Sequence, residues 1–243
     1  MAVTEATPSR FDWGLGTAIG TSFAMVFRNV VPFVGLSLLI GTPRFLLART
    51  GVPLWLTLVI DLVIGQIVTI VLIYATVQSL RGRKAGILAC FGQGFSRLPA
   101  AIGVAILSVV AYVLGLGLLI VPGLMLASIW AVAIPVAVVE NAGIGTSFSR
   151  SASLTRGRRW RVFGTLAVSW LIYAVAYVLV LVAIVLPLLG LTRGGRWWIS
   201  LIPMWIVASV LQAYLSALSG VLYYFLRRDK EGADIETIAA VFD

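Results

Sequence analysis

The sequence has no histidine and only one cysteine, Cys90, among its 243 residues. A lone cysteine cannot form a disulfide within the chain. Zinc sites that use histidine or paired cysteines are excluded, as are the Ser-His and Cys-His pairs of many hydrolases. A metal held by carboxylates alone needs several of them together, yet Asp61 and Glu140 are the only acidic residues outside the two ends of the chain. We therefore expect no enzymatic activity, no metal and no other cofactor.

Charged residues are scarce as well. They make up 11% of the chain, hydrophobic residues make up 60%, and the mean hydropathy is +1.06. A soluble domain typically has ~25% charged and ~45–50% apolar residues. So few charges cannot cover a surface that faces water, which indicates a membrane protein.

Long apolar runs fill most of the sequence. A helix needs about 20 residues to cross the ~30 Å hydrocarbon layer of a bilayer. Six stretches reach or approach that length, at residues 30–47, 54–80, 100–121, 124–139, 162–191 and 198–226. We predict an all-α, polytopic membrane protein with six transmembrane helices.

The basic residues divide unequally between the two sides that six spans define. One side has only Arg44, Arg49, Arg193 and Arg196 of the 18 Lys and Arg. Short loops rich in Lys and Arg stay in the cytoplasm, so the opposite side, with both chain ends, is expected to face the cytoplasm across a bacterial inner membrane. The net charge is +9, and the basic residues that produce it lie beside apolar spans. This position favours anionic lipid over nucleic acid as the partner.

Three stretches with apolar residues at helical spacing precede the first, third and fifth spans: "GTAIGTSFAMVF", "GILACFGQGFSRL" and "GIGTSFSRSASLTR". Each is predicted to be an amphipathic helix that lies on the membrane before a helical hairpin enters it, either as a simple entry segment or as a basic collar that binds anionic lipid. We expect one integral membrane domain, residues 1–243, with repeat units at about 12–81, 82–141 and 142–228 and a cytoplasmic tail at about 229–243.

Asp61 lies well inside the second span, and Gln66 and Thr69 continue a polar trace along the same helix. A carboxylate at membrane depth is costly, so it marks a candidate ion or proton site. Alternatively, Asp61 pairs with an arginine, for which Arg44 is the foremost candidate, or faces an outer vestibule. Asp61, Gln66 and Arg44 form the candidate intramembrane polar site, with these three interpretations open.

The segment that follows the fourth span is rich in arginine. Glu140 is predicted to form a salt bridge between loops that fixes the position of the interfacial helix after it. Trp160 is expected at the membrane interface, where amphipathic rings prefer to lie. The candidate contacts to lipid headgroups or other anions are Arg150, Arg156, Arg158, Arg159 and Arg161.

Two prolines interrupt the uncharged residues 121–139. Pro122 and Gly123 favour a tight turn between the third and fourth spans. Pro135 removes one backbone hydrogen bond and kinks the fourth span. It should therefore face protein, where neighbouring groups can satisfy the freed carbonyl.

Residues 121–164 resemble the signature block of a membrane domain fused to some bacterial glycerophosphoryl diester phosphodiesterases, and of related uncharacterised inner-membrane proteins. The matching positions are Pro122, Gly123, Trp130, Pro135, Glu140, Ser151, Leu154, Thr155, Gly157 and Trp160. The resemblance implies six membrane helices in three units. It does not extend to phosphodiesterase activity, because the fused enzymes carry that activity on a separate barrel with histidine ligands.

Two functions compete on these observations. The first is a non-enzymatic scaffold or accessory subunit that contacts anionic lipid or a membrane partner, the partner being a second copy of the chain or another protein. The second is a small-solute or ion transporter or channel that uses Asp61. For a third function, a lipid-modifying enzyme, the sequence offers almost no candidate catalytic residues.

Overall fold

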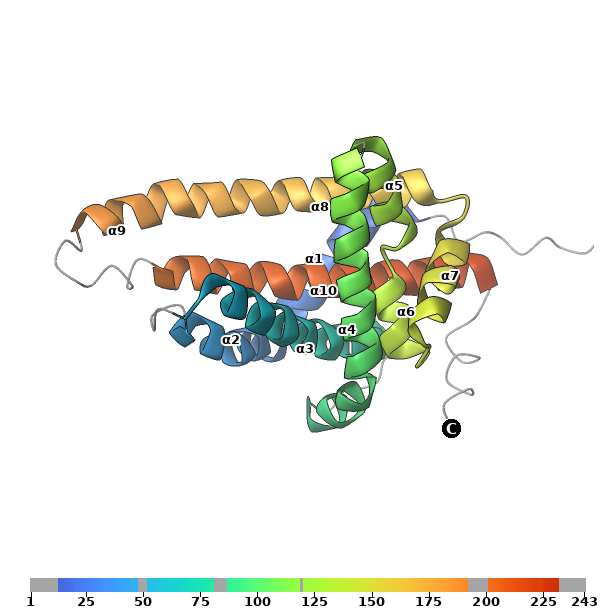
Figure 1. The fold of residues 1–243 in the computed structure, drawn as a ribbon, viewed down its shortest axis with the longest axis horizontal. Helices are drawn as coiled ribbons and strands as arrows, with labels where there is room; N and C mark the ends of the chain where they lie inside the picture. The colour runs from blue at the N-terminus through green and yellow to red at the C-terminus, as the bar shows by residue number, and fades with distance from the viewer. Residues whose placement is uncertain (1–12, 48–51, 81–86, 119, 192–200, 232–243) are drawn as a thin grey trace, which may run out of the picture.

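The computed structural model describes residues 13–47, 52–80, 87–118, 120–191 and 201–231 (Figure 1). All regular elements in these ranges are helices, which confirms the all-α prediction for this part of the chain. They are α1 (Leu15–Arg28), α2 (Val30–Leu47), α3 (Leu54–Leu80), α4 (Ile87–Leu118), α5 (Ile120–Ile129), α6 (Ala133–Val139), α7 (Ile144–Thr155), α8 (Arg159–Val180), a π-helical turn (Leu181–Val185), α9 (Leu186–Leu191) and α10 (Leu201–Glu231).

The long helix α10 organises the molecule. Its Gln212 contacts Thr69 of α3, and its Gly220 lies against Thr76 of the same helix, so α3 and α10 run parallel. Ser169 of α8 contacts Tyr214 of α10. Arg158, which precedes α8, contacts Asp229 near the end of α10, so α8 runs antiparallel to α10. Figure 1 shows α8 and α10 along the long axis, with α4 and α5 crossing that direction near one end.

Three stretches among the described residues are long and apolar enough to cross a membrane: Val63–Leu80, Arg159–Leu188 and Ile202–Glu231. A fourth arises if α1 and the first part of α2, which meet at a bend of 81°, count as one broken span. The structure therefore supports the coarse prediction of a helical membrane protein with three or four apolar spans. Where the third and fourth spans were predicted, the described side chains give shorter apolar stretches: Arg97–Tyr112, within the 32-residue helix α4, and Gly123–Val139, across α5 and α6.

Helix α1 forms where an amphipathic interfacial helix was expected, but it packs into the bundle. It buries Ala18, Ser22 and Val26, and leaves Leu15 38% exposed. Small residues at such a contact let two helix backbones approach closely. The preceding Trp13, only 1% exposed, packs on Phe225 of α10. Trp13 and the buried face of α1 are thus part of the core.

Helices α4 and α5 form a close hairpin. A Cβ added to Gly115 would lie 2.9 Å from the Cα of Gly123, so the two backbones touch at a pair of glycines. The turn expected at Pro122 and Gly123 is displaced, because α5 begins at Ile120 and both residues lie near its start. Proline is tolerated there because N–H groups in the first turn have no partner within the helix.

The predicted fourth span is broken between α5 and α6, at residues 130–132. The two pieces are held by side chains from other helices: Ser151 and Thr155 of α7 donate to the carbonyl of Ile129, at 2.8 and 3.3 Å, and Arg97 of α4 donates to the carbonyl of Val138. Pro135 is buried in α6, as predicted. Hydroxyl and guanidinium donors thus satisfy carbonyls at the ends of the two pieces.

We expect Ser151→Ala to lower the free energy of unfolding by about 1 kcal/mol, because it removes a buried hydrogen bond to Ile129. The melting midpoint in detergent should fall by roughly 2–4 °C. Ser149→Ala is the matched control, because that exposed hydroxyl bonds only to the carbonyl of Thr146 in its own helix. Equal shifts for the two variants would contradict a role for α7 in closing the break.

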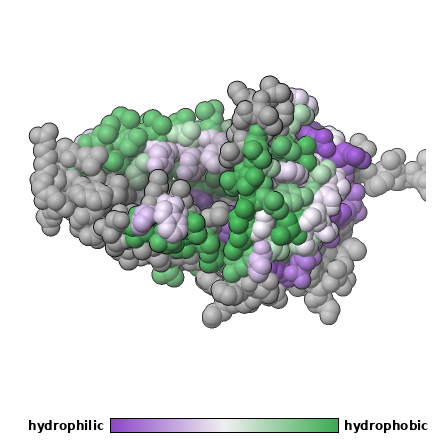
Figure 2. All heavy atoms as spheres, in the orientation of Figure 1, coloured by the Kyte–Doolittle hydropathy of each residue, from purple (hydrophilic) through white to green (hydrophobic). Residues whose placement is uncertain are grey.

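The two ends of the molecule differ in polarity. Figure 2 shows hydrophilic residues gathered at the end where α7, the start of α8 and the end of α10 meet, while hydrophobic residues cover much of the rest of this face. The exposed surface of α8 is apolar along most of its length and includes Val168, Trp170, Leu171, Val175 and Leu179. Hydrocarbon is the solvent that suits such a surface.

Candidate functional site

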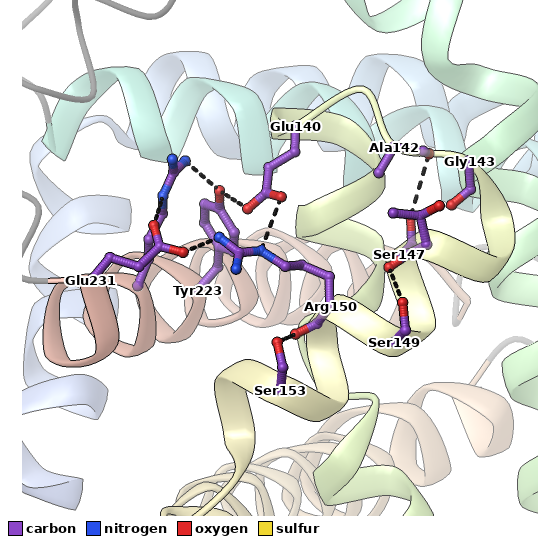
Figure 3. Close-up of polar contacts among 11 residues, drawn as sticks. Glu140, Ala142, Gly143, Ser147, Ser149, Arg150, Ser153, Tyr223 and Glu231 are labelled. Atoms are coloured by element: carbon purple, nitrogen blue, oxygen red, sulfur yellow. Dashed lines mark hydrogen bonds and ion pairs between the residues drawn. The ribbon is translucent and has the colours of Figure 1, made fainter.

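A closed ring of polar contacts ties α6, α7 and α10 together at the hydrophilic end (Figure 3). Glu140 follows α6 and accepts from the hydroxyl of Tyr223 at 2.9 Å and from Nε of Arg150 at 3.2 Å. Arg150 also pairs with Glu231, which accepts from Nε of Arg227 at 2.8 Å. The ring closes where Nη1 of Arg227 donates to Tyr223 at 2.9 Å. The salt bridge predicted for Glu140 is therefore present.

Arg150 is the centre of this ring because it contacts both carboxylates. Partial burial lowers its pKa, but the hydrogen bonds and negative charges of Glu231 and Glu140 outweigh burial and hold the pKa above its ordinary value. Side-chain exposures of 33% for Arg150 and 20% for Glu140 leave the ring partly open to solvent. It is therefore suited to fix the positions of helices, and its carboxylates are already paired.

A second contact joins the start of α8 to α10. Arg158 holds Asp229 in a bidentate pair, with Nε to Oδ2 at 2.9 Å and Nη2 to Oδ1 at 3.0 Å, and the Asp229 side chain is only 6% exposed. The planar guanidinium matches a carboxylate in this geometry, which makes such pairs strong and directional. Three residues along, Arg161 donates to the carbonyl of Trp13 at 2.7 Å and lies over its ring.

The five arginines predicted to contact anions are therefore used differently. Arg150, Arg158 and Arg161 bind other parts of the chain. Arg156 is exposed at the end of α7. Arg159 lines a pocket, and its Nε is buried without a hydrogen-bond partner among the described residues. This division follows from helix geometry, because successive residues at the start of α8 point about 100° apart around the axis.

The turn between α7 and α8 determines the directions in which the neighbouring arginines point. Gly157 adopts φ +82°, a left-handed conformation that favours glycine, and α8 begins two residues later. Trp160 follows in the first turn and is 75% exposed. Its place at the membrane interface stays a prediction. Gly157 thus directs the arginines on either side of it toward different neighbours.

The candidate intramembrane site lies partly outside the described residues. Asp61 is on α3 and Arg44 on α2, but their side chains are not among those described. Gln66 is on α3, and its Oε1 is buried without a hydrogen-bond partner in the described part of the chain. Thr69, one turn along, accepts from Nε2 of Gln212 at 2.8 Å, so the polar trace joins α3 to α10. Hydrogen bonds of this kind stabilise helix pairs in membranes.

The partners supplied by α10 were not predicted from the sequence. Tyr223, Asp229 and Glu231 each contact a residue more than 70 positions away. The available signal is the i, i+4 spacing of Arg227 and Glu231, which indicates that the helix continues past the last apolar residue. The predicted tail begins at Asp229, but α10 extends to Glu231, and the rest of the tail lies outside the described residues.

Within the described ranges, no group of three or more metal-ligating side chains comes together. Comparison with protein-family models, with curated proteins and with solved structures found no match. The resemblance to the phosphodiesterase-associated membrane domain therefore stays a prediction.

Proposed function

We propose that this chain is a non-enzymatic scaffold or accessory subunit of a membrane, which presents a rigid, basic end to anionic lipid or to a membrane partner. The observation that carries the proposal is the interlocking of α6, α7, α8 and α10 by charged side chains at one end. Charged networks of this kind fix the relative positions of helices. Arg159 and Trp160 lie beside that network, in the first turn of α8.

The proposal includes six spans in three units, with the hydrophilic end and both chain ends in the cytoplasm of a bacterium. The supporting observation is that the start of α8 and the end of α10 lie together, as expected if the arginine-rich loops share one side. The family resemblance of residues 121–164 adds to the same reading. In that arrangement α4 is the third span and α5 with α6 the fourth, and both would turn from the crosswise direction that α4 and α5 take in Figure 1.

Native mass spectrometry of the protein, extracted with its lipids, tests the scaffold proposal because it reports bound lipid, partner and stoichiometry together. We expect retained anionic lipid, a second copy of the chain or a partner subunit. A lipid-free, partner-free monomer that moves solute in proteoliposomes would contradict the proposal.

A transporter or channel is the second candidate, and it is favoured by Oε1 of Gln66, which is buried without a hydrogen-bond partner among the described residues. This buried acceptor lies five residues after Asp61 on α3. Polar groups without partners at membrane depth are unusual, and they mark ion or substrate paths in many transporters. Asp61, Gln66 and Arg44 would then line a route for a small solute or ion.

Asp61→Asn separates the two candidates. If the chain is a scaffold, we expect the variant to change only the melting midpoint or the oligomeric state, because the carboxylate then serves helix packing. Fluorescent-dye flux from proteoliposomes should be the same for wild type and variant. Flux that collapses in a variant with an unchanged melting midpoint would favour the transporter.

A further inference from the structure

A pocket of about 200 Å³ opens between α5 and the first turn of α8, outside the ring of charged contacts. Its lining surface is almost wholly apolar, and the residues that contribute to it are Leu124, Met125, Ser128, Arg159, Trp160 and Phe163. Ser128 donates to the carbonyl of Leu124 at 3.1 Å, so its hydroxyl is already satisfied within α5. Arg159 is therefore the one charged side chain among the described residues that line this pocket.

Arg159 differs from its neighbours because its Nε is buried without a hydrogen-bond partner in the described part of the chain. This Nε is shielded from solvent, so an anion would bind the outer nitrogens of the half-buried guanidinium and offset the cost of the unpaired donor through its charge. The α8 N-terminus adds a further positive potential at the same place, since its first N–H groups have no partner within the helix. The charge at the pocket thus calls for an anionic group.

The position of the pocket identifies the source of that anion. Arg159 is the first residue of an apolar stretch long enough to span a membrane, so the pocket lies where hydrocarbon gives way to headgroups. Trp160 is 75% exposed there, while Leu124 and Met125 are 38% and 40% exposed, so the pocket opens toward the lipid-facing surface. Tryptophan at this depth is typical of the membrane interface.

We propose that this pocket binds one anionic phospholipid, with a segment of one acyl chain between α5 and α8 and the phosphate on Arg159. The volume is below the ~300–1,000 Å³ typical of small-molecule sites, so it suits part of one chain and not a whole lipid. The inference rests on the lipid contact of the proposed scaffold, which it assigns to a particular site and lipid class. It uses the packing of α5 against α8 in the structure and not the six-span arrangement, in which Leu124 and Arg159 lie at opposite ends of their spans.

The test uses the full-length protein, delipidated in detergent, and native mass spectrometry with phosphatidylglycerol or phosphatidylcholine of the same acyl chains. We expect wild type to prefer phosphatidylglycerol by about tenfold, and Arg159→Gln to abolish that preference, because it removes the charge at the headgroup. Arg156→Gln is the matched control, since Arg156 is exposed one turn away and does not line the pocket. It should change the preference less than about twofold.

A second variant tests the acyl-chain part of the site and keeps the charge. Met125→Trp should weaken binding of both lipids by about tenfold, because the larger side chain fills the pocket. Ser128→Leu fills the same pocket and replaces Met125→Trp if that variant does not fold. An unchanged affinity in the pocket-filling variant would overturn the proposal, because the lipid would then be held by surface charge alone.

The same spectra distinguish other occupants. Release of the bound lipid by excess inorganic phosphate would show that only the anion is recognised, and a change in oligomeric state with Arg159→Gln would indicate that a second copy covers the pocket. Either result overturns the proposal. If wild type retains phosphatidylglycerol and Arg159→Gln retains it equally, the assignment of the lipid to this pocket is wrong, but the scaffold function stands. If wild type binds neither lipid, the site is wrong, and the scaffold function is judged by partner retention and flux.

Discussion

Arg158→Met should lower the melting midpoint of the detergent-solubilised protein by roughly 6–12 °C, which corresponds to about 3 kcal/mol for a chain of this size. The reason is the Asp229 carboxylate, which is 6% exposed and loses both hydrogen bonds of its bidentate partner. A buried charge left without its partner costs much more than the pair itself contributes. The loss should be visible as separation of α8 from α10, for example in the rate of limited proteolysis.

The double variant Arg158→Met with Asp229→Leu is the matched control. It removes both charges and leaves apolar groups of similar size, so we expect most of the lost stability to return. Arg156→Met should change the midpoint by no more than about 1 °C, because Arg156 is an exposed cation in the same turn. A double variant as unstable as the single variant would contradict the account of this pair as a desolvated ion pair.

Gly115→Ala should destabilise the protein by about 2 kcal/mol, because the new Cβ would lie 2.9 Å from the Cα of Gly123. The Cα of Gly123 is a backbone atom, so it cannot move aside without separating α5 from α4. We expect a melting midpoint lower by roughly 4–8 °C.

Gly65→Ala is the control for this substitution, because a Cβ at Gly65 of α3 meets nothing within 4 Å. That variant should be neutral or slightly stabilising, by about 0.5–1 kcal/mol, since alanine favours a helix. If Gly115→Ala behaves as Gly65→Ala does, the two helices are not in the close contact described.

The helices themselves could largely be predicted from the sequence. Apolar runs and helical spacing locate α2, α3, α7 and the last helix to within a few residues. Hydropathy alone could not reveal the break after Ile129, because the residues on both sides are uncharged, but the kink predicted from Pro135 lies close to it. The hydroxyl donors from α7 that bond to the Ile129 carbonyl were not predicted. The same limit applies to α1, whose buried face combines the small residues Ala18 and Ser22 with Val26, while Phe27 is 72% exposed.

The candidate site was predicted in part. Glu140 stood out as a lone acid beside arginines, and its pairing with Arg150 follows from charge and proximity in sequence. Tyr223 and Asp229 could not be assigned, because their partners come from distant segments and one sequence carries no record of such contacts. The separate role of Arg159 was hidden within a run of arginines, and depends on which side of α8 each one faces.

The central claim is that six spans keep the arginine-rich end and both chain ends on the cytoplasmic side. Single cysteines, introduced after Cys90→Ser, test it through labelling with a membrane-impermeant maleimide in intact spheroplasts. Gly195→Cys should be labelled at once, while Thr4→Cys, Arg156→Cys and Phe242→Cys should react only after lysis. Labelling of Arg156→Cys in intact spheroplasts, or of one chain end but not the other, would contradict the claim, because an odd number of spans places the two ends on opposite sides.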